Sequence, residues 1–182
     1  KRYQLIPRGK TLIHIDILPE EIGRTKRAEV ALAADARLAL EDLAAALGAE
    51  QGAARRKPYA GEVAQAMAAW RAGAAEKYRS RETPINIGRI IGELNAILPE
   101  DGVLVADGGF AAHWGGLLFD TKQAGRGFVA NRGLASIGYG VPGGIGTQLG
   151  IGASRRALAL TGDGGFNMSL GELETAKRAG AN

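Results

Sequence analysis

Two aspartates of this sequence stand directly beside glycines, just after short apolar runs. Asp163 lies in a Gly-Asp-Gly-Gly stretch at 162–165, and Asp107 begins Asp-Gly-Gly at 107–109. A hard divalent cation takes oxygen ligands, and one carboxylate can anchor it if a phosphate supplies others. Neighbouring glycines let backbone N–H groups approach phosphate oxygens closely. These residue types are compatible with a site for a phosphate and a divalent cation, in which Asp163 would be the metal ligand.

The elements that must position these turns are short parallel strands. Residues 103–106 (VLVA) and 157–160 (ALAL) are typical of buried strands, and one Asp-Gly turn follows each of them. Open parallel sheets bind ligands beyond the carboxyl ends of their strands, which is where both turns are expected. The alternative is a tight turn without a ligand, because Asp-Gly is a common turn dipeptide.

A helix is predicted directly after the second turn. Ser169 and Glu172 fit the S-x-x-E capping box, and Leu170, Leu173 and Ala176 fall on one side of the helix that it would start. The positive end of such a helix would favour a bound phosphate.

The first 48 residues predict a strand, a second strand and a helix. Residues 11–17 (TLIHIDI) are typical of a buried parallel strand, and a short strand follows near 28–32. Asp35 is the expected N-cap of a helix with leucines at helical spacing, and Gly48 its expected C-cap.

The middle of the chain predicts a linker and two helices. Residues 49–57 lack periodicity and are interpreted as a linker, and an alanine-rich helix is expected over about 61–79. Thr83-Pro84 is predicted to start a helix with one apolar face, which Pro99 ends. We therefore divide the chain into residues 1–48, 49–82 and 83–182.

Composition narrows the class of protein. The 182 residues are 46% hydrophobic and 23% charged, as in globular proteins, and they contain no cysteine. Disulfides and thiolate metal sites are therefore excluded. The net charge of +4 is scattered, which argues against nucleic acid as a partner, and no apolar run is long enough for a membrane span. We expect a soluble, cytoplasmic protein.

The segment 162–176 (GDGGFNMSLGELETA) resembles the first half of the thiamine-diphosphate motif, GDGxFxMxxxELxTA, of acetolactate synthases and their relatives. Residues 133–146 (GLASIGYGVPGGIG) resemble the GLGxMGxGLPxAIGA segment of the same family. The resemblance implies that Ile137 bends the cofactor into a V shape. It also implies that the Ala135 carbonyl and the Ile137 N–H contact the pyrimidine ring. The alternative is a glycine-rich helix selected only for close packing.

The stretch from Asp107 falls where acetolactate synthases have Asp-x-Gly-Gln-His-x-x-Trp. Gly109 and Trp114 fit this pattern, but Phe110 and Ala111 replace the Gln-His pair, which leaves the substrate open. His113 is displaced by two positions and is interpreted as structural. The resemblance therefore implies the following cofactor-binding residues: Gly109, Phe110, Ala111, Ala135, Ile137, Asp163, Gly164 and Gly165, with Mg²⁺ on Asp163.

Residues 14–24 (HIDILPEEIGR) resemble the HIDIDPxEIGK segment that closes the family's central domain. In relatives that bind flavin, the positions of Asp16, Ile17 and Asp35 lie near the nucleotide, so FAD is a possible second cofactor. The alternative is that Asp16 only caps local structure.

The resemblance implies an α/β fold: parallel sheets with helices on both faces. Residues 1–48 would be the end of a Rossmann-like central domain, and 83–182 the first part of the thiamine-diphosphate-binding domain. The family's second metal ligand would then follow Asn182, and its activating glutamate would lie in an upstream domain. No catalytic residue is therefore named in this chain.

The expected function is decarboxylation of a 2-oxo acid followed by carboligation, as in acetolactate synthases. A 2-oxo acid decarboxylase or oxidase with the same cofactor is the nearest alternative, and a noncatalytic cofactor-binding relative is another. The family also implies a homodimer or homotetramer.

Overall fold

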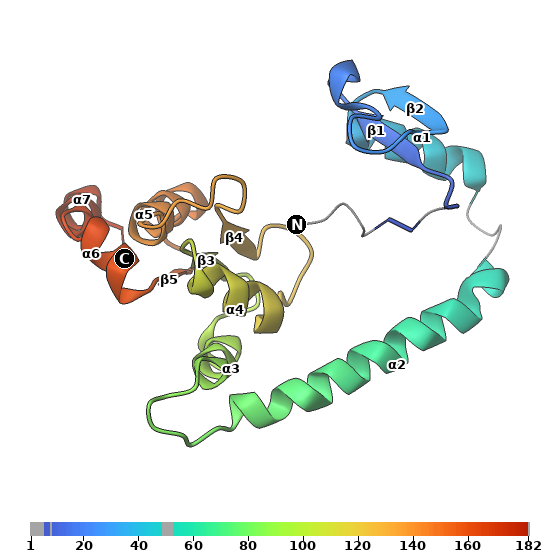
Figure 1. Ribbon diagram of the computed structural model, residues 1–182. Helices are drawn as coiled ribbons and strands as arrows, with labels where there is room; N and C mark the ends of the chain where they lie inside the picture. Colours follow the sequence, from blue (N-terminus) through green and yellow to red (C-terminus); the bar gives the residue numbers. More distant parts are fainter. Residues whose placement is uncertain (1–5, 8, 49–52, 182) are drawn as a thin grey trace. The chain divides into compact units, whose positions relative to one another are not determined.

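The structure is a computed structural model that describes residues 6, 7, 9–48 and 53–181. The chain separates into two compact units, Lys1–Val63 and Ala64–Asn182 (Figure 1). Part of the predicted linker, residues 49–52, lies outside the described residues.

The first unit is a two-stranded parallel sheet with one helix. Strand β1 (Ile13–Asp16) pairs with β2 (Val30–Ala33) along their whole length, and a short 3-10 helix, η1 (Pro19–Glu21), lies in the connection. Helix α1 (Ala36–Leu47) follows β2. Its predicted caps are confirmed: the Asp35 side chain accepts from the Leu38 N–H at 3.0 Å, and Gly48 has a φ of +67°.

Helices α2 and α3 correct two sequence predictions. Helix α2 (Ala53–Tyr78) already includes the residues from Ala53 that were interpreted as linker. Helix α3 (Ile87–Ile97) begins after the predicted Thr83-Pro84 start, because Asn86 caps it by accepting from the Gly88 N–H at 2.9 Å. Its end before Pro99 is confirmed.

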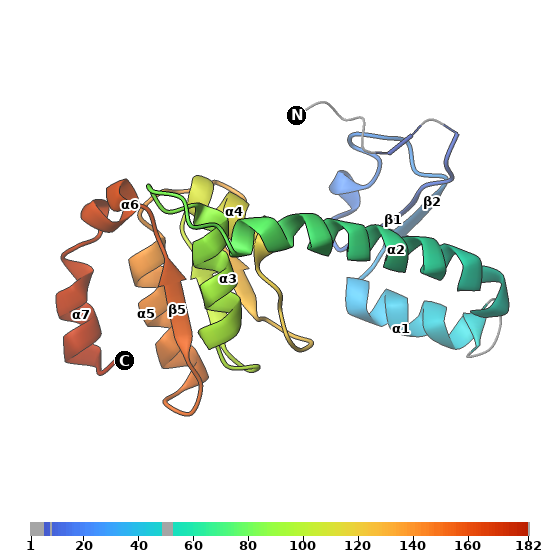
Figure 2. The ribbon, with the colours of Figure 1, turned by 90° about the horizontal axis from the view of Figure 1, so that it is seen from below.

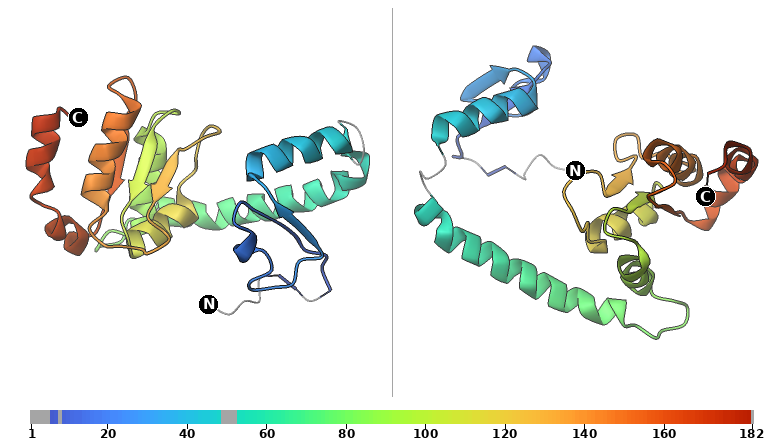
Figure 3. Two further views of the ribbon diagram at one scale, coloured as in Figure 1. Left: turned by 90° about the horizontal axis from the view of Figure 1, so that it is seen from above. Right: turned by 180° about the vertical axis from the view of Figure 1, so that it is seen from behind.

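The second unit contains a three-stranded parallel sheet in the order β4-β3-β5. The predicted strands are confirmed as β3 (Val103–Ala106) and β5 (Ala157–Leu160), whereas β4 (Phe128–Ala130) was not predicted. All four residues of the central strand β3 are buried, as a parallel strand covered on both faces requires. The strands lie side by side in Figure 3.

Helices cover both faces of this sheet, so the predicted fold class is confirmed. The connection from β3 to β4 contains α4 (Phe110–Leu118), and that from β4 to β5 contains α5 (Gly140–Ile151). These connections run in opposite directions across the sheet, so right-handed crossovers place α4 and α5 on opposite faces (Figures 1 and 2). Helix α3 packs beside α4.

The helical segment after β5 differs from the predicted one. Helix α6 (Asp163–Met168) begins at Asp163 itself, and α7 (Glu172–Ala179) follows a turn and packs on α5. The predicted capping box is wrong, because the residue before α7 is Gly171 and the Ser169 hydroxyl donates to the Gly165 carbonyl at 3.1 Å. A six-residue helix is too short for apolar periodicity to indicate it.

Candidate functional site

The carboxyl ends of β3 and β5 lie next to each other at a change in chain direction. After β3 the chain enters α4 on one face of the sheet, and after β5 it continues to α7, which packs with α5 on the other face. Open α/β sheets bind ligands beyond the carboxyl ends of adjacent parallel strands whose connections part in this way. Asp107 directly follows β3, and Thr161 directly follows β5.

Asp107 is buried at this edge of the sheet, with 1% of its surface exposed. Its carboxylate accepts from the Gly108 N–H at 2.6 Å and from the Thr161 hydroxyl at 2.7 Å. The Gly138 N–H lies 3.0 and 3.2 Å from the two carboxylate oxygens. The donors come from the end of β3, the end of β5 and the loop 131–139, so one side chain joins three segments.

The hydrogen bonds keep this buried carboxyl group ionised. Burial acts to raise the pKa of Asp107, but hydrogen bonds from Thr161 and from the backbone of Gly108, Gly138 and Gly140 outweigh it and lower the pKa. Both oxygens face N–H and O–H donors, so Asp107 is an acceptor for protein groups rather than a metal ligand.

Glycines let the surrounding backbone approach this carboxylate. A Cβ at Gly165 would lie 2.0 Å from the Asp107 Oδ2, and one at Gly140 would lie 3.0 Å from the Asp107 Cβ. At Gly108 a Cβ would meet the Ala135 carbonyl oxygen at 2.8 Å. Close packing thus explains part of the glycine-rich sequence, and it explains why the first residue of α5, Gly140, is a glycine.

The loop 131–139 has its own internal restraints. Ala135 has a φ of +54°, the only positive φ outside glycine among the described residues. Its N–H donates to the Asn131 carbonyl at 2.9 Å, and the Asn131 side-chain amide donates to the Ser136 carbonyl. The side-chain oxygen of Asn131 is buried, and within the described part of the chain it has no hydrogen-bond partner. Asn131 directly follows β4, so a polar residue directly follows each of the three strands.

The structure brings the predicted site residues to this one edge of the sheet. Asp163 is the exposed first residue of α6, two residues beyond Thr161. Gly109 has a φ of +70° at the start of α4, with Phe110 and Ala111 after it. The remaining predicted residues come from the loop and from α6: Ala135, Ile137, Gly164 and Gly165.

Exposed apolar side chains belong to the same segments. Phe110, Leu134, Ile137 and Met168 are all exposed, and they flank the ends of β3, β4 and β5 in the chain. Binding sites for small molecules combine apolar surface with a few placed polar groups, which is the composition found here. Sequence reasoning missed Met168, Leu134 and the acceptor Asn131.

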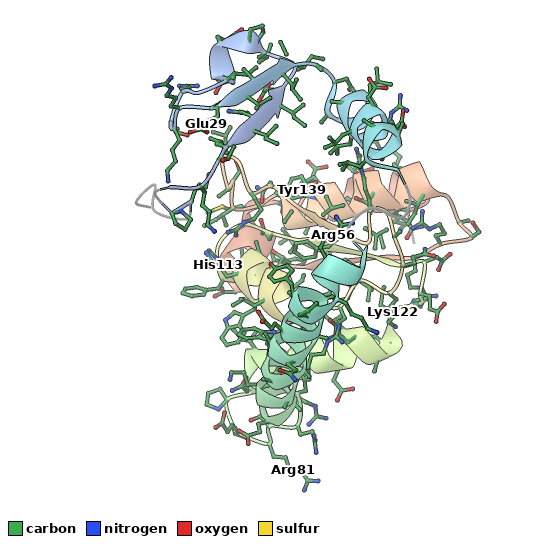
Figure 4. All side chains as sticks on the ribbon, turned by 90° about the vertical axis from the view of Figure 1, so that its right-hand side faces the viewer. Glu29, Arg56, Arg81, His113, Lys122 and Tyr139 are labelled. Atoms are coloured by element: carbon green, nitrogen blue, oxygen red, sulfur yellow. The ribbon has the colours of Figure 1, made fainter. Side chains whose placement is uncertain are left out.

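His113 contacts the first turn of α4, in agreement with its interpretation as a structural residue. Its ring (Figure 4) has Nδ1 2.6 Å from the Gly109 carbonyl oxygen one helical turn earlier. The ring also lies tilted against that of Phe110, with 6.1 Å between the ring centroids. The imidazole therefore fastens the first turn of α4, the turn that follows the Gly109 bend.

The two carboxylates considered for a flavin site have local partners. The Asp16 Oδ1 accepts from the Leu18 N–H at 2.9 Å, and Asp35 is the N-cap of α1. These contacts agree with the alternative in which Asp16 caps local structure.

The described residues contain no group of three or more His, Asp and Glu side chains that could hold a metal by themselves. A cation at Asp163 would therefore need ligands from a bound molecule or from residues outside that set. Among these residues there is also no helix with the length and apolar character of a membrane span.

Comparison with known proteins gives matches over most of the chain. Residues 107–182 match the family described as "Thiamine pyrophosphate enzyme, C-terminal TPP binding domain". A probable 2-ketoarginine decarboxylase of Pseudomonas aeruginosa is 34% identical, over 94% of this chain and 29% of that protein. A probable acetolactate synthase large subunit of Methanocaldococcus jannaschii is 31% identical, over 90% of this chain and 28% of that protein.

Acetolactate synthase isozyme 3 large subunit of Escherichia coli is 27% identical, over 91% of this chain and 28% of that protein. This chain thus spans less than a third of the length of the relatives it matches. The family match begins at Asp107, so it includes Asp107, the loop 131–139 and the start of α6.

Two neighbouring glycines of α6 should respond oppositely to alanine. Gly165→Ala places a methyl group against the Asp107 carboxylate and should destabilise the protein by about 1–3 kcal/mol. The added Cβ of Gly164→Ala would meet no atom within 4 Å. This variant should be as stable as the parent protein or more stable by up to about 1 kcal/mol, because alanine favours the helix more than glycine does. Urea unfolding of both variants measures this difference; equal stabilities would contradict the packing described.

Asp107 should also make stability depend on acid pH. Because its folded-state pKa lies below the ordinary value of 3.8, the ionised carboxylate stabilises the fold above pH 3.8. That contribution is lost as the pH falls through the folded-state pKa. Asp107→Asn should lower the free energy of unfolding by about 1–3 kcal/mol at neutral pH. The variant should also lose less stability than the parent protein as the pH falls. Urea unfolding from pH 7 to pH 3 tests this, with the exposed Asp120→Asn as control; an unchanged pH profile in Asp107→Asn would refute it.

Proposed function

Residues 107–182 belong to the thiamine pyrophosphate-binding C-terminal domains of thiamine pyrophosphate enzymes, and we propose that the intact protein converts 2-oxo acids with thiamine diphosphate and Mg²⁺. The observation that carries this proposal is the meeting of three segments at one edge of the sheet. They are the end of β3, the loop 131–139 and the start of α6, and each supplies residues expected to contact this cofactor.

The residues at this edge fit such a cofactor. At Gly109, Gly162 and Gly164 an added Cβ would meet no atom within 4 Å. A ligand can therefore approach the backbone closely at these positions. The buried oxygen of Asn131 is an acceptor without a partner in the described structure. Exposed apolar side chains on the same segments offer surface to aromatic rings.

We assign each residue the part that its position allows. Asp163 would bind the cation, since its exposed carboxylate stands at the end of a strand beside glycines. The backbone of Gly164 and Gly165 would face the diphosphate. Ala135 would offer its carbonyl to the pyrimidine, and the Ile137 side chain would support the bend between the two rings.

The cofactor, when bound, supplies the nucleophilic carbon and the electron sink for decarboxylation. The protein's contribution is to bind it, to orient its rings and to keep it on the metal. No described residue is assigned as a general acid or base.

The favoured reaction is decarboxylation of a 2-oxo acid followed by addition to a second carbonyl compound. This choice rests on the acetolactate synthases among the relatives. Simple decarboxylation is the second candidate. It is favoured by the similarity to a probable 2-ketoarginine decarboxylase and by Phe110 and Ala111 in place of the expected Gln-His pair. Three further expectations from the sequence stay predictions. They are assembly into a homodimer or homotetramer, the binding of FAD and a cytoplasmic location.

Replacing the proposed metal ligand should weaken cofactor binding. Asp163→Asn should lower the affinity of the intact protein for thiamine diphosphate in Mg²⁺ by at least about tenfold, because the amide lacks the carboxylate charge. Asp120→Asn is the control, because it removes an exposed carboxylate near Arg71 instead. This variant should bind thiamine diphosphate as tightly as the parent protein. Calorimetric titration gives both affinities. Equal affinities of Asp163→Asn and parent would remove Asp163 from the site.

Product analysis separates the two candidate reactions. With pyruvate as the only substrate, the intact protein should release carbon dioxide and accumulate acetolactate, the product of addition to a second pyruvate. Free acetaldehyde without acetolactate would favour simple decarboxylation instead. Chromatography of the products measures both, and Asp163→Asn supplies the background, since the metal-site change should abolish either product.

A further inference from the structure

Asp107 joins segments that are far apart in the chain. Gly138 is 31 residues away from it, and Thr161 is 54 residues away, yet both donate to its carboxylate. A carboxylate with these donors and 1% exposure is a fixed point of the folded chain, because an unmatched buried charge would be strongly destabilising.

The two long-range donors stand beside residues to which we have assigned cofactor contacts. Gly138 follows Ile137 directly, so the hydrogen bond to its N–H fixes the peptide plane that carries the Ile137 carbonyl. Thr161 precedes Asp163 by two residues, at the end of β5. One carboxylate thus sets the distance between the loop that would face the rings and the residue that would bind the metal.

We propose that Asp107 is a positioning residue, which holds the loop 131–139 and the start of α6 in the arrangement that binds the cofactor, and that Thr161 transmits its effect to Asp163. This inference rests on the proposed function and deepens it. It concerns residues that would not touch the cofactor themselves.

Backbone strain in the loop supports this role. Ala135 adopts a φ of +54°, a conformation that is unfavourable for a residue with a side chain and persists where the surroundings enforce it. The Asp107 bond to Gly138 is one restraint, and the Asn131 bond to the Ser136 carbonyl is another. A third is the close approach of Gly108 to the Ala135 carbonyl. The ordering of the loop is then completed in folding, before any ligand binds.

The contacts distinguish Asp107 from Asp163 in chemical role. Both oxygens of Asp107 face donors within the protein, whereas Asp163 is exposed at the edge of the sheet. Asp107 can therefore act on the cofactor only through the segments that it joins.

The test removes one donor and leaves the carboxylate in place. Thr161→Val has nearly the same shape as threonine but no hydroxyl, and Thr161→Ser keeps the hydroxyl. Thr147→Val on α5 is the control: this threonine is also half-buried, but it lines a pocket with Val103 near the amino end of β3. The affinity of each intact variant for thiamine diphosphate in Mg²⁺ is measured by calorimetry, well below its unfolding midpoint, and its stability is measured separately.

Thr161→Val should bind about ten- to a hundredfold more weakly, the range expected for loss of one hydrogen bond to a charged group. Thr161→Ser should restore most of the affinity, and Thr147→Val should bind like the parent. Asp107→Asn, where it folds, should bind at least as weakly as Thr161→Val.

If Asp107 only stabilised the fold, the affinity of Thr161→Val for the cofactor would not change. Thr161→Val would then unfold more easily and yet, while folded, bind the cofactor as tightly as the parent, which would overturn the proposal. Failure of the parent protein to bind thiamine diphosphate would instead reject the proposed function, and the positioning role with it. The parent titration therefore separates the two failures.

Discussion

A single buried charge organises the C-terminal unit. An ionised carboxyl group without water must be surrounded by donors, and at Asp107 those donors come from β3, β5 and the loop after β4. Satisfying it forces these segments to meet, and it explains why backbone without side chains is needed at Gly108, Gly140 and Gly165. The arrangement of these segments thus follows from an electrostatic requirement.

The parallel sheet places that charge at a useful position. Crossovers in opposite directions separate α4 from α5 and leave the carboxyl ends of β3 and β5 open between them. The strand pairing continues to the edge, because the Asp107 N–H donates to the Leu160 carbonyl at 2.9 Å. Asp107 and Thr161 therefore emerge side by side, and the exposed Asp163 follows at the rim.

Local sequence signals predicted much of this fold. The apolar runs of β3 and β5 and the caps Asp35 and Gly48 were found because neighbouring residues determine them. Strand β4 was missed because three residues carry no periodic pattern, and the start of α6 because an S-x-x-E pattern a few residues later resembled a cap. For the site, the sequence predicted that both Asp-Gly turns follow the carboxyl ends of parallel strands, and the structure has them there.

The role of Asp107 could not be predicted, since its partners lie 31 and 54 residues away. That separation has a consequence for protein design. Residues expected to touch the cofactor could be copied onto another α/β scaffold, but without the buried aspartate, its threonine and the glycines around them they would lack a common frame. A transplant of this site should therefore begin with the groups that a ligand never meets.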